Sequence, residues 1–170
     1  MRKVMSVLLI GLLSACASET TKPTDAVEDR PATQGAASAA PGAPTDPNLN
    51  PILTDPKNIL SKRSVYYDYD SYVVKSEYRP LVQAHAQYLR DNAGARVLLQ
   101  GNTDERGSRE YNLALGQRRA ESVKNAMTMS GARENQIEAV SLGEEKPRAT
   151  GHDDASWAEN RRTDIRYKGE

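Results

Sequence analysis

The sequence predicts an α/β sandwich in which helices pack on one face of a mixed sheet. Two observations support this fold class. Segments with strand composition alternate with helical segments through roughly the last 107 residues, in the order β-α-β-α-β-α-β. All nine aromatic residues also lie in that part of the chain, from Tyr66 onward, so a core can form there. A domain of this size can fold alone.

The first strand is expected at residues 64–68, where valine and two tyrosines follow one another. A helix follows through Asn92, with Ser76 as its N-cap and Pro80 in its first turn, where a missing N–H is tolerated. Gly94 lies just beyond its end. The expected inner face has 3.6-residue spacing and includes a histidine that we interpret as a core residue: Tyr78, Leu81, Val82, His85, Ala86 and Leu89.

A second strand is expected at residues 96–100, and a long helix from about Ser108 to Ser130 that Gly131 ends. A third strand at residues 137–142, a short helix at 155–160 and a last strand at 162–167 complete the order. The core face of the long helix is predicted from small and apolar residues spaced three and four apart: Leu113, Gly116, Ala120, Val123 and Met127.

Charge and composition limit the classes of partner. The chain has 23 lysines and arginines and 23 acidic residues, so its formal net charge is zero. Proteins that bind nucleic acid usually carry a basic excess, and we therefore expect no nucleic-acid partner. Only 38% of the residues are hydrophobic and the mean hydropathy is -0.71, which indicates that part of the chain has no packed core.

The N-terminus has the features of a secretory signal. Residues 1–15 combine two basic residues with an apolar run that is too short to span a bilayer core of ~30 Å. The next residue is the only cysteine, and residues 13–16 (LSAC) resemble the lipobox of bacterial lipoproteins. That resemblance implies acylation of Cys16, and the absence of an aspartate after it favours the outer membrane. We therefore expect a lipid anchor in the outer-membrane bilayer and a domain in the periplasm; an ordinary signal peptide is the alternative.

Residues 16–61 are expected to be the lipidated cysteine followed by a disordered tether. Seven of the nine prolines lie between Pro23 and Pro56, and the segment shows no helical or strand period. A flexible coil of about 45 residues spans roughly 35–40 Å root-mean-square. The folded domain is accordingly assigned to residues 62–170.

A charged segment follows the second strand. Residues 101–107 are expected to form a loop before the long helix. Asn112 and Arg119 lie two turns apart on one face of that helix, and Arg119 can reach a loop carboxylate such as Asp104. A guanidinium beside a carboxylate complements the zwitterion of a free amino acid. The other interpretation is an Asp104–Arg119 ion pair that only fixes the loop.

The same segment resembles a known family. The sequences GNTDERGS, YNL and RRA, which begin at Gly101, Tyr111 and Arg118, resemble the signature of the OmpA-like peptidoglycan-binding domain. Further landmarks lie at residues 66–71, 141–147 and 160–162, so the resemblance covers about residues 64–168. The sequence departs from the common pattern at Asn102, where the family often has histidine.

The resemblance implies non-catalytic binding of peptidoglycan through the diaminopimelate side chain of its stem peptide, without a cofactor. Carried over by position, Asp104 receives the ammonium group of that side chain and Arg119 holds its carboxylate. Together with the lipobox and the tether, the resemblance also implies a role in the Tol system, in envelope integrity and cell division, with TolB and TolA as partners. TolB is expected to dock on a surface that overlaps the wall site. The other expected ligand-binding residues are Asn112, Tyr69, Asp70, Ser71 and Arg106.

Other chemistries fit the sequence less well. Residues 68–71 begin like a calcium loop, but Tyr72 and Val73 follow where an EF-hand needs Asp or Asn and then Gly. His152 precedes two aspartates, yet the sequence has no nucleophile elbow and no Cys/His metal spacing. We therefore expect neither an enzyme nor a metal site, and we interpret Trp157 as a packing residue.

Two functions from different classes remain open. One is a wall-binding anchor of the Tol system. The other is an OmpA-like lipoprotein that acts mainly as a scaffold for protein partners outside that system. Capture of TolB by the chain would distinguish the two, as would the effect of Asp104→Ala on wall association.

Overall fold

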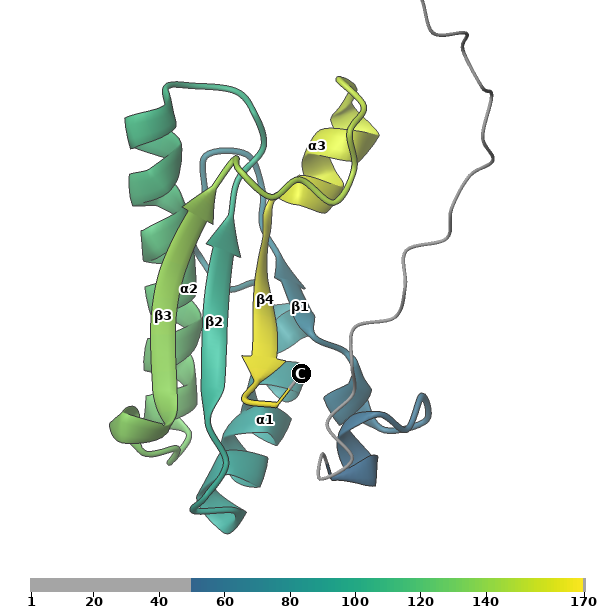
Figure 1. Ribbon diagram of the computed structural model, residues 1–170, viewed down its shortest axis with the longest axis vertical. Helices are drawn as coiled ribbons and strands as arrows, with labels where there is room; N and C mark the ends of the chain where they lie inside the picture. The colour runs from purple at the N-terminus through teal and green to yellow at the C-terminus, as the bar shows by residue number, and fades with distance from the viewer. Residues whose placement is uncertain (1–49, 170) are drawn as a thin grey trace, which may run out of the picture. The chain divides into compact units, whose positions relative to one another are not determined.

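A computed structural model describes residues 50–169 of the protein (Figure 1). The expected signal peptide, Cys16 and most of the tether lie outside these residues. The regular elements follow the predicted order: β1 (Ser64–Tyr66), α1 (Arg79–Asp91), β2 (Val97–Asn102), α2 (Arg109–Met129), β3 (Ile137–Gly143), α3 (Asp154–Asn160) and β4 (Arg162–Tyr167). No helix within residues 50–169 is long and apolar enough to cross a membrane.

The four strands form one mixed sheet in the order β1-β4-β2-β3. The parallel pair is β2 and β3, and α2 is the crossover between them; β4 runs antiparallel to both β1 and β2. Figure 1 shows α1 and α2 on the same face of this sheet, as predicted, whereas α3 lies at the end of the sheet where β2 and β3 finish. The loops at this end of the sheet contain most of the residues of the predicted site.

The inner face of α1 is the predicted one, but its beginning is not. Five of the six expected residues are buried, and Tyr78 packs partly buried against them. The prediction that Ser76 caps α1 is wrong, because Ser76 begins a separate 3-10 turn and α1 starts at Arg79 without a side-chain cap. Pro80 lies in the first turn, and the backbone N–H of Asn92 closes the helix on the carbonyl of Tyr88.

The inner face of α2 differs from the prediction in its first half. Leu113 is 52% exposed, so its assignment to the core is wrong, and Leu115 is buried instead. Two polar residues, Asn112 and Arg119, are also buried on this helix. The first turns of α2 therefore cover a polar pocket, and only the later turns, through Val123 and Met127, cover the apolar core. Ser108 caps the helix through the N–H of Tyr111.

Two glycines bring α2 directly onto β2. A Cβ at Gly101 would lie 1.8 Å from the carbonyl oxygen of Gly116, and a Cβ at Gly116 would lie 2.3 Å from Oγ of Ser141. The expectation that residues 101–107 form a loop is wrong at its start, because Gly101 and Asn102 continue β2 beside β3. This contact fixes the position of α2 along β2.

The fold begins earlier than residue 62. Residues 50–61 form two 3-10 turns, each started by an asparagine whose Oδ1 accepts a backbone N–H: Asn50 from Ile52 and Asn58 from Leu60. Leu53 and Leu60 are buried in the core. The C-terminal end of the expected tether is therefore folded, because these two leucines dock it on the domain. Two leucines seven residues apart form no periodic pattern from which this could be predicted.

The glycine contact can be tested by adding one methyl group. Gly101→Ala should lower the free energy of unfolding by about 3 kcal/mol or more, because the new Cβ collides with the backbone of α2. Gly94→Ala is the matched control: its Cβ meets no atom within 4 Å, so the change should stay below about 1 kcal/mol. Urea unfolding measures both values, and equal stability of the two variants would contradict the packing described here.

A buried histidine makes stability depend on pH. His85 is fully buried; its Nε2 faces the carbonyl of Lys62 and its Nδ1 faces the hydroxyl of Tyr167, each at 2.9 Å. A carbonyl only accepts, so Nε2 carries the hydrogen and Nδ1 accepts from Tyr167. Burial lowers the pKa of His85 from 6.5 to about 4.

Because the folded pKa of His85 lies below the unfolded value, the unfolded chain binds the proton first as pH falls. The free energy of unfolding should therefore drop between about pH 6.5 and pH 4, by on the order of 3 kcal/mol. His85→Gln should reduce this drop, whereas replacing the exposed His152 by Gln should preserve it. Urea unfolding across the pH range tests this, and an undiminished drop in His85→Gln would contradict it.

Candidate functional site

A pocket of about 210 Å³ lies at the end of the sheet where β2 finishes, between the first turns of α2 and the loop after β1. It contains six of the seven ligand-binding residues expected from the sequence. Ser71 does not line the pocket, and its carbonyl instead accepts a hydrogen bond from Arg119. The six lining residues are Tyr69, Asp70, Asp104, Arg106, Asn112 and Arg119.

Arg119 forms the inner wall of the pocket and has no exposed surface. Its Nε donates to the carbonyl of Ser71 at 2.8 Å, Nη1 to that of Asn102 at 2.8 Å, and Nη2 to that of Asp68 at 3.3 Å. The ring of Tyr67 lies 5.0 Å from its guanidinium carbon. Burial lowers the pKa of Arg119 to about 10, so the group remains charged at neutral pH.

The alternative interpretation, an Asp104–Arg119 ion pair that fixes the loop, is wrong. Asp104 pairs with two other arginines through its Oδ2: Nη2 of Arg106 at 2.7 Å and Nη1 of Arg161 at 3.2 Å. Its Oδ1 accepts the backbone N–H of Arg106 at 3.2 Å. Burial opposes ionisation of this carboxyl, but the hydrogen bonds from the two arginines outweigh burial, so its pKa lies below the ordinary value.

Thr103 and Arg161 also line the pocket and are not among the site residues predicted from the sequence. The hydroxyl of Thr103 is buried and has no hydrogen-bond partner within residues 50–169. A buried hydroxyl without a partner is costly, and a ligand or water in the pocket would satisfy it. The position of Thr103 beside Asp104 was the only available signal. Arg161 belongs to the 160–162 landmark, but a residue 57 positions from Asp104 cannot be paired with it from spacing.

The rim of the pocket is aromatic and charged. Tyr69 is 62% exposed, and its ring lies 4.2 Å from the guanidinium carbon of Arg106. Asp70 has a φ of 52°, and its carboxylate accepts the hydroxyl of Tyr111. The amide nitrogen of Asn112 donates to the carboxylate of Glu144, so this residue holds the chain after β3 to the start of α2.

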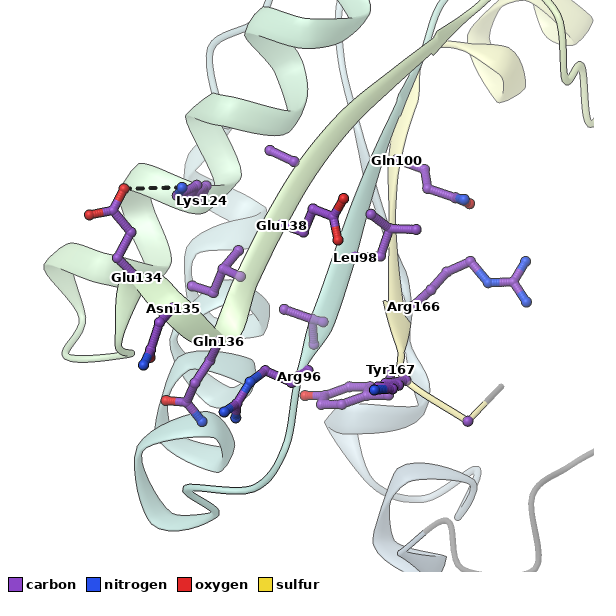
Figure 2. Close-up of a pocket in the computed structure, with 15 residues that line it drawn as sticks. Arg96, Leu98, Gln100, Lys124, Glu134, Asn135, Gln136, Glu138, Arg166 and Tyr167 are labelled. Carbon is purple, nitrogen blue, oxygen red and sulfur yellow. Dashed lines mark ion pairs between the residues drawn. The ribbon is translucent and has the colours of Figure 1, made fainter.

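A second hollow, of about 830 Å³, lies along the open face of the sheet near Leu98 and Arg166 (Figure 2). Its charged residues are all at least partly exposed to solvent, and none of the expected site residues lines it. The smaller pocket is the stronger candidate because buried charges and an unsatisfied hydroxyl need a partner, whereas exposed charges are solvated.

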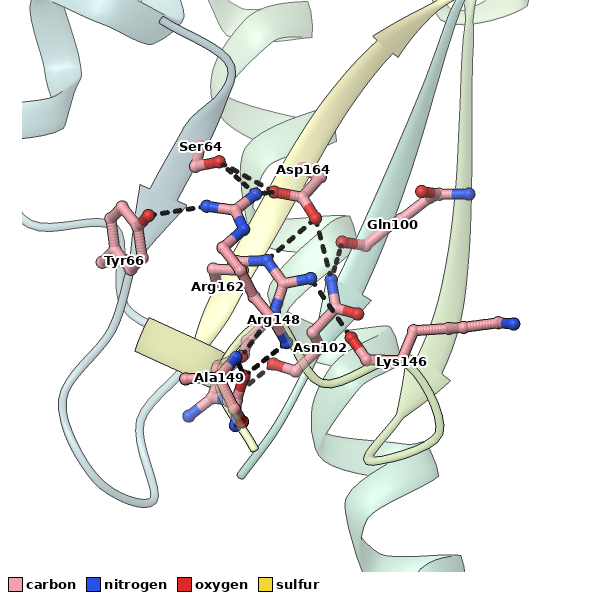
Figure 3. Close-up of polar contacts among 11 residues, drawn as sticks. Ser64, Tyr66, Gln100, Asn102, Lys146, Arg148, Ala149, Arg162 and Asp164 are labelled. Atoms are coloured by element: carbon pink, nitrogen blue, oxygen red, sulfur yellow. Dashed lines mark hydrogen bonds and ion pairs between the residues drawn. The ribbon is translucent and has the colours of Figure 1, made fainter. Parts of the chain in front are cut away.

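Polar contacts on the open face tie the segment after β3 to the sheet (Figure 3). Asp164 on β4 accepts from Arg148 at 2.7 Å and from Arg162 at 2.9 Å. The side chain of Asn102 donates to the carbonyl of Gln100 and, at 3.4 Å, to Asp164, while its backbone carbonyl accepts from Arg119. Asn102, where the family often has histidine, thus connects this network to the pocket wall.

Comparisons with known proteins agree with this fold. A family model described as the OmpA family matches residues 66–161. The peptidoglycan-associated lipoprotein of Pseudomonas putida is 42% identical over 142 residues, which cover 78% of this chain and 85% of that protein. That of Legionella pneumophila is 43% identical over 161 residues, which cover 92% and 89%.

Solved structures give the same result. The crystal structure of the peptidoglycan-associated lipoprotein from Burkholderia pseudomallei is 58% identical, with a TM-score of 0.68 over 69% of this chain and 99% of that one. The C-terminal domain of Helicobacter pylori MotB has a TM-score of 0.58 at 18% identity, which shows a shared fold alone.

Adjacent arginines provide a matched test of the pocket wall. Arg119→Met should lower the free energy of unfolding by about 3 kcal/mol or more, because three carbonyls lose a charged donor. Arg118→Met, at the exposed neighbouring position, should change it by less than about 0.5 kcal/mol. Urea unfolding compares the two, and similar losses would show that Arg119 does not hold the wall together.

Proposed function

The chain belongs to the OmpA family and, within it, to the peptidoglycan-associated lipoproteins. From this membership we propose that the chain binds peptidoglycan non-covalently, through the diaminopimelate side chain of the stem peptide. The observation that carries this proposal is a small pocket in which a buried carboxylate and a buried guanidinium are not paired with each other. Such a pocket complements a group that carries both an ammonium and a carboxylate.

The carboxylate of the ligand is assigned to Arg119. Within residues 50–169 the guanidinium of Arg119 donates to three carbonyls, one from each nitrogen, whereas a guanidinium has five N–H groups. Two donors therefore remain for a ligand. The pocket lining also holds three arginines and only two aspartates, an excess of one positive charge that favours an anionic group.

The ammonium of the ligand is assigned to Asp104 and Thr103. Oδ2 of Asp104 is occupied by two arginines, but Oδ1 has only the 3.2 Å contact with a backbone N–H. A carboxylate can accept about four hydrogen bonds, so Oδ1 can take the ammonium. The hydroxyl of Thr103, which lacks a partner within the described chain, can accept a second N–H of the same group. Tyr69, Asp70 and Asn112 would shape the entrance.

The wider role follows from the N-terminal sequence and the relatives. An acylated Cys16 would hold the chain in the outer membrane, and the periplasmic domain would bind the wall, so the protein would tether one layer to the other. Relatives called lipoproteins support the anchor. In this proposal the protein acts without catalysis, within the Tol system, and TolB and TolA are its protein partners.

Exposed apolar side chains favour a protein partner as a second ligand of the same region. They lie in the loop after β1 and on the first two turns of α2, and two of them, Tyr69 and Tyr111, also line the pocket. A protein that docks on this surface would cover the pocket, so its binding and wall binding would exclude each other. The residues of this surface are Tyr69, Tyr72, Val73, Tyr111 and Leu113, which are 45% to 68% exposed.

Calorimetric titration of the full-length chain with a diaminopimelate-containing muropeptide tests the proposal. Asp104→Asn and Arg119→Lys should each weaken binding by about tenfold or more, since each leaves one charge of the ligand without its partner. Arg118→Lys is the control and should bind like the wild type. Amidation of the ligand's free carboxylate should weaken binding to a similar extent. The ligand would then carry only its ammonium group, and the excess positive charge of the pocket would no longer be neutralised.

Urea unfolding of each variant separates loss of binding from loss of fold. Binding that survives in folded Asp104→Asn and Arg119→Lys would reject the pocket as the site. Absence of binding by the wild type would leave the protein-partner function as the better account of the surface.

A further inference from the structure

Arg106 lies over two aromatic rings at the rim of the pocket. Its guanidinium carbon is 4.2 Å from the ring centroid of Tyr69 and 4.2 Å from that of Trp157. Tyr69 comes from the loop after β1 and Trp157 from α3. A guanidinium is planar and weakly hydrated, and it stacks well on aromatic faces. The interpretation of Trp157 as a packing residue is therefore incomplete.

Glu105 holds the edge of the same indole ring. Its Oε1 accepts Nε1 of Trp157 at 2.8 Å, and the imidazole Nδ1 of His152 lies 2.7 Å from that oxygen. Glu105 and Arg106 are consecutive, so neighbouring residues of one loop contact Trp157 at its edge and at its face. A ring held in both directions cannot turn without breaking one of the contacts. We call Glu105, Arg106 and Trp157 the Trp157 clasp.

The clasp acts on the carboxylate of the pocket. Nη2 of the stacked Arg106 lies 2.7 Å from Oδ2 of Asp104, and Asp104 itself is 4% exposed. Within residues 50–169 the guanidinium of Arg106 contacts Oδ2 alone, and Oδ1 accepts only the backbone N–H of Arg106, so Oδ1 keeps acceptor capacity. A guanidinium that is free to rotate would form a bidentate pair with both oxygens and would compete with an incoming ammonium.

We propose that Glu105 and Trp157 are positioning residues for the pocket: they hold Arg106 in its stacked orientation, and through Arg106 they keep one oxygen of Asp104 available to the ammonium of a ligand. Neither residue lines the pocket. This inference rests on the proposed function, since it concerns how the same site binds a zwitterionic group.

Affinity for the diaminopimelate-containing muropeptide provides the first test, with the full-length chain. Glu105→Ala and Trp157→Leu should each weaken binding by roughly fivefold, the effect expected when one cation–π contact no longer orients its cation. Glu159→Ala is the matched control for Glu105→Ala, because Glu159 is an exposed residue of α3, and it should bind like the wild type. The urea unfolding midpoints of these variants should agree with that of the wild type.

A double-mutant cycle separates positioning from direct contact. If Trp157 acts through Arg106, then Trp157→Leu should add less than about a twofold loss in an Arg106→Ala background. Trp157 is the single tryptophan of the chain, so its fluorescence also reports on the clasp without interference. Muropeptide should shift this emission in the wild type and in Glu159→Ala, and the shift should shrink in Glu105→Ala.

Two outcomes would overturn the inference in different ways. If the wild type binds and Glu105→Ala and Trp157→Leu bind equally well, the clasp is rejected and the proposed function stands. The same holds if the loss of affinity in Trp157→Leu simply adds to the loss in Arg106→Ala. No binding by the wild type would reject the proposed function and the clasp with it.

Discussion

The fold around the pocket depends on one buried guanidinium. Arg119 donates to the carbonyls of Asp68 and Ser71 in the loop after β1 and to that of Asn102 at the end of β2. Burying a cation is expensive, and three hydrogen bonds from a charged donor offset that cost only if all three acceptors stay in place. Arg119 therefore makes the strand end, the loop and α2 mutually dependent. Gly116, one turn earlier, lets the helix come close enough for these contacts.

Periodicity predicted the parts of the fold that bury apolar side chains. The inner face of α1 and the second half of α2 are such parts, because burial of hydrophobic surface sets their orientation. It failed at Leu113 because the first half of α2 turns polar residues inward. The spacing of apolar residues cannot identify a helix face whose buried residues include Asn112 and Arg119. Leu53 and Leu60 were missed since two isolated leucines carry no period.

The residues of the pocket were easier to predict than their pairing. The signature between Gly101 and Ala120 is local, so the family resemblance could name four residues there, Asp104, Arg106, Asn112 and Arg119, that line one pocket in the structure. Which cation meets which carboxylate depends instead on contacts between distant segments. Asp104 meets Arg161 rather than Arg119 because the end of α3 brings Arg161 to the pocket, and the sequence gives no measure of that approach. The role of Thr103 could be inferred only from the folded structure, in which its buried hydroxyl has no hydrogen-bond partner within residues 50–169.

The docking of residues 50–61 on the domain also bears on how it would carry mechanical load. β1 follows this segment directly and lies at the edge of the sheet, paired with β4. A pull applied at Asn50 would first load the two 3-10 turns, because Leu53 and Leu60 are buried in the core, and only then β1. Hydrophobic packing of these two leucines would therefore resist such a pull before it strained the pairing of β1 with β4.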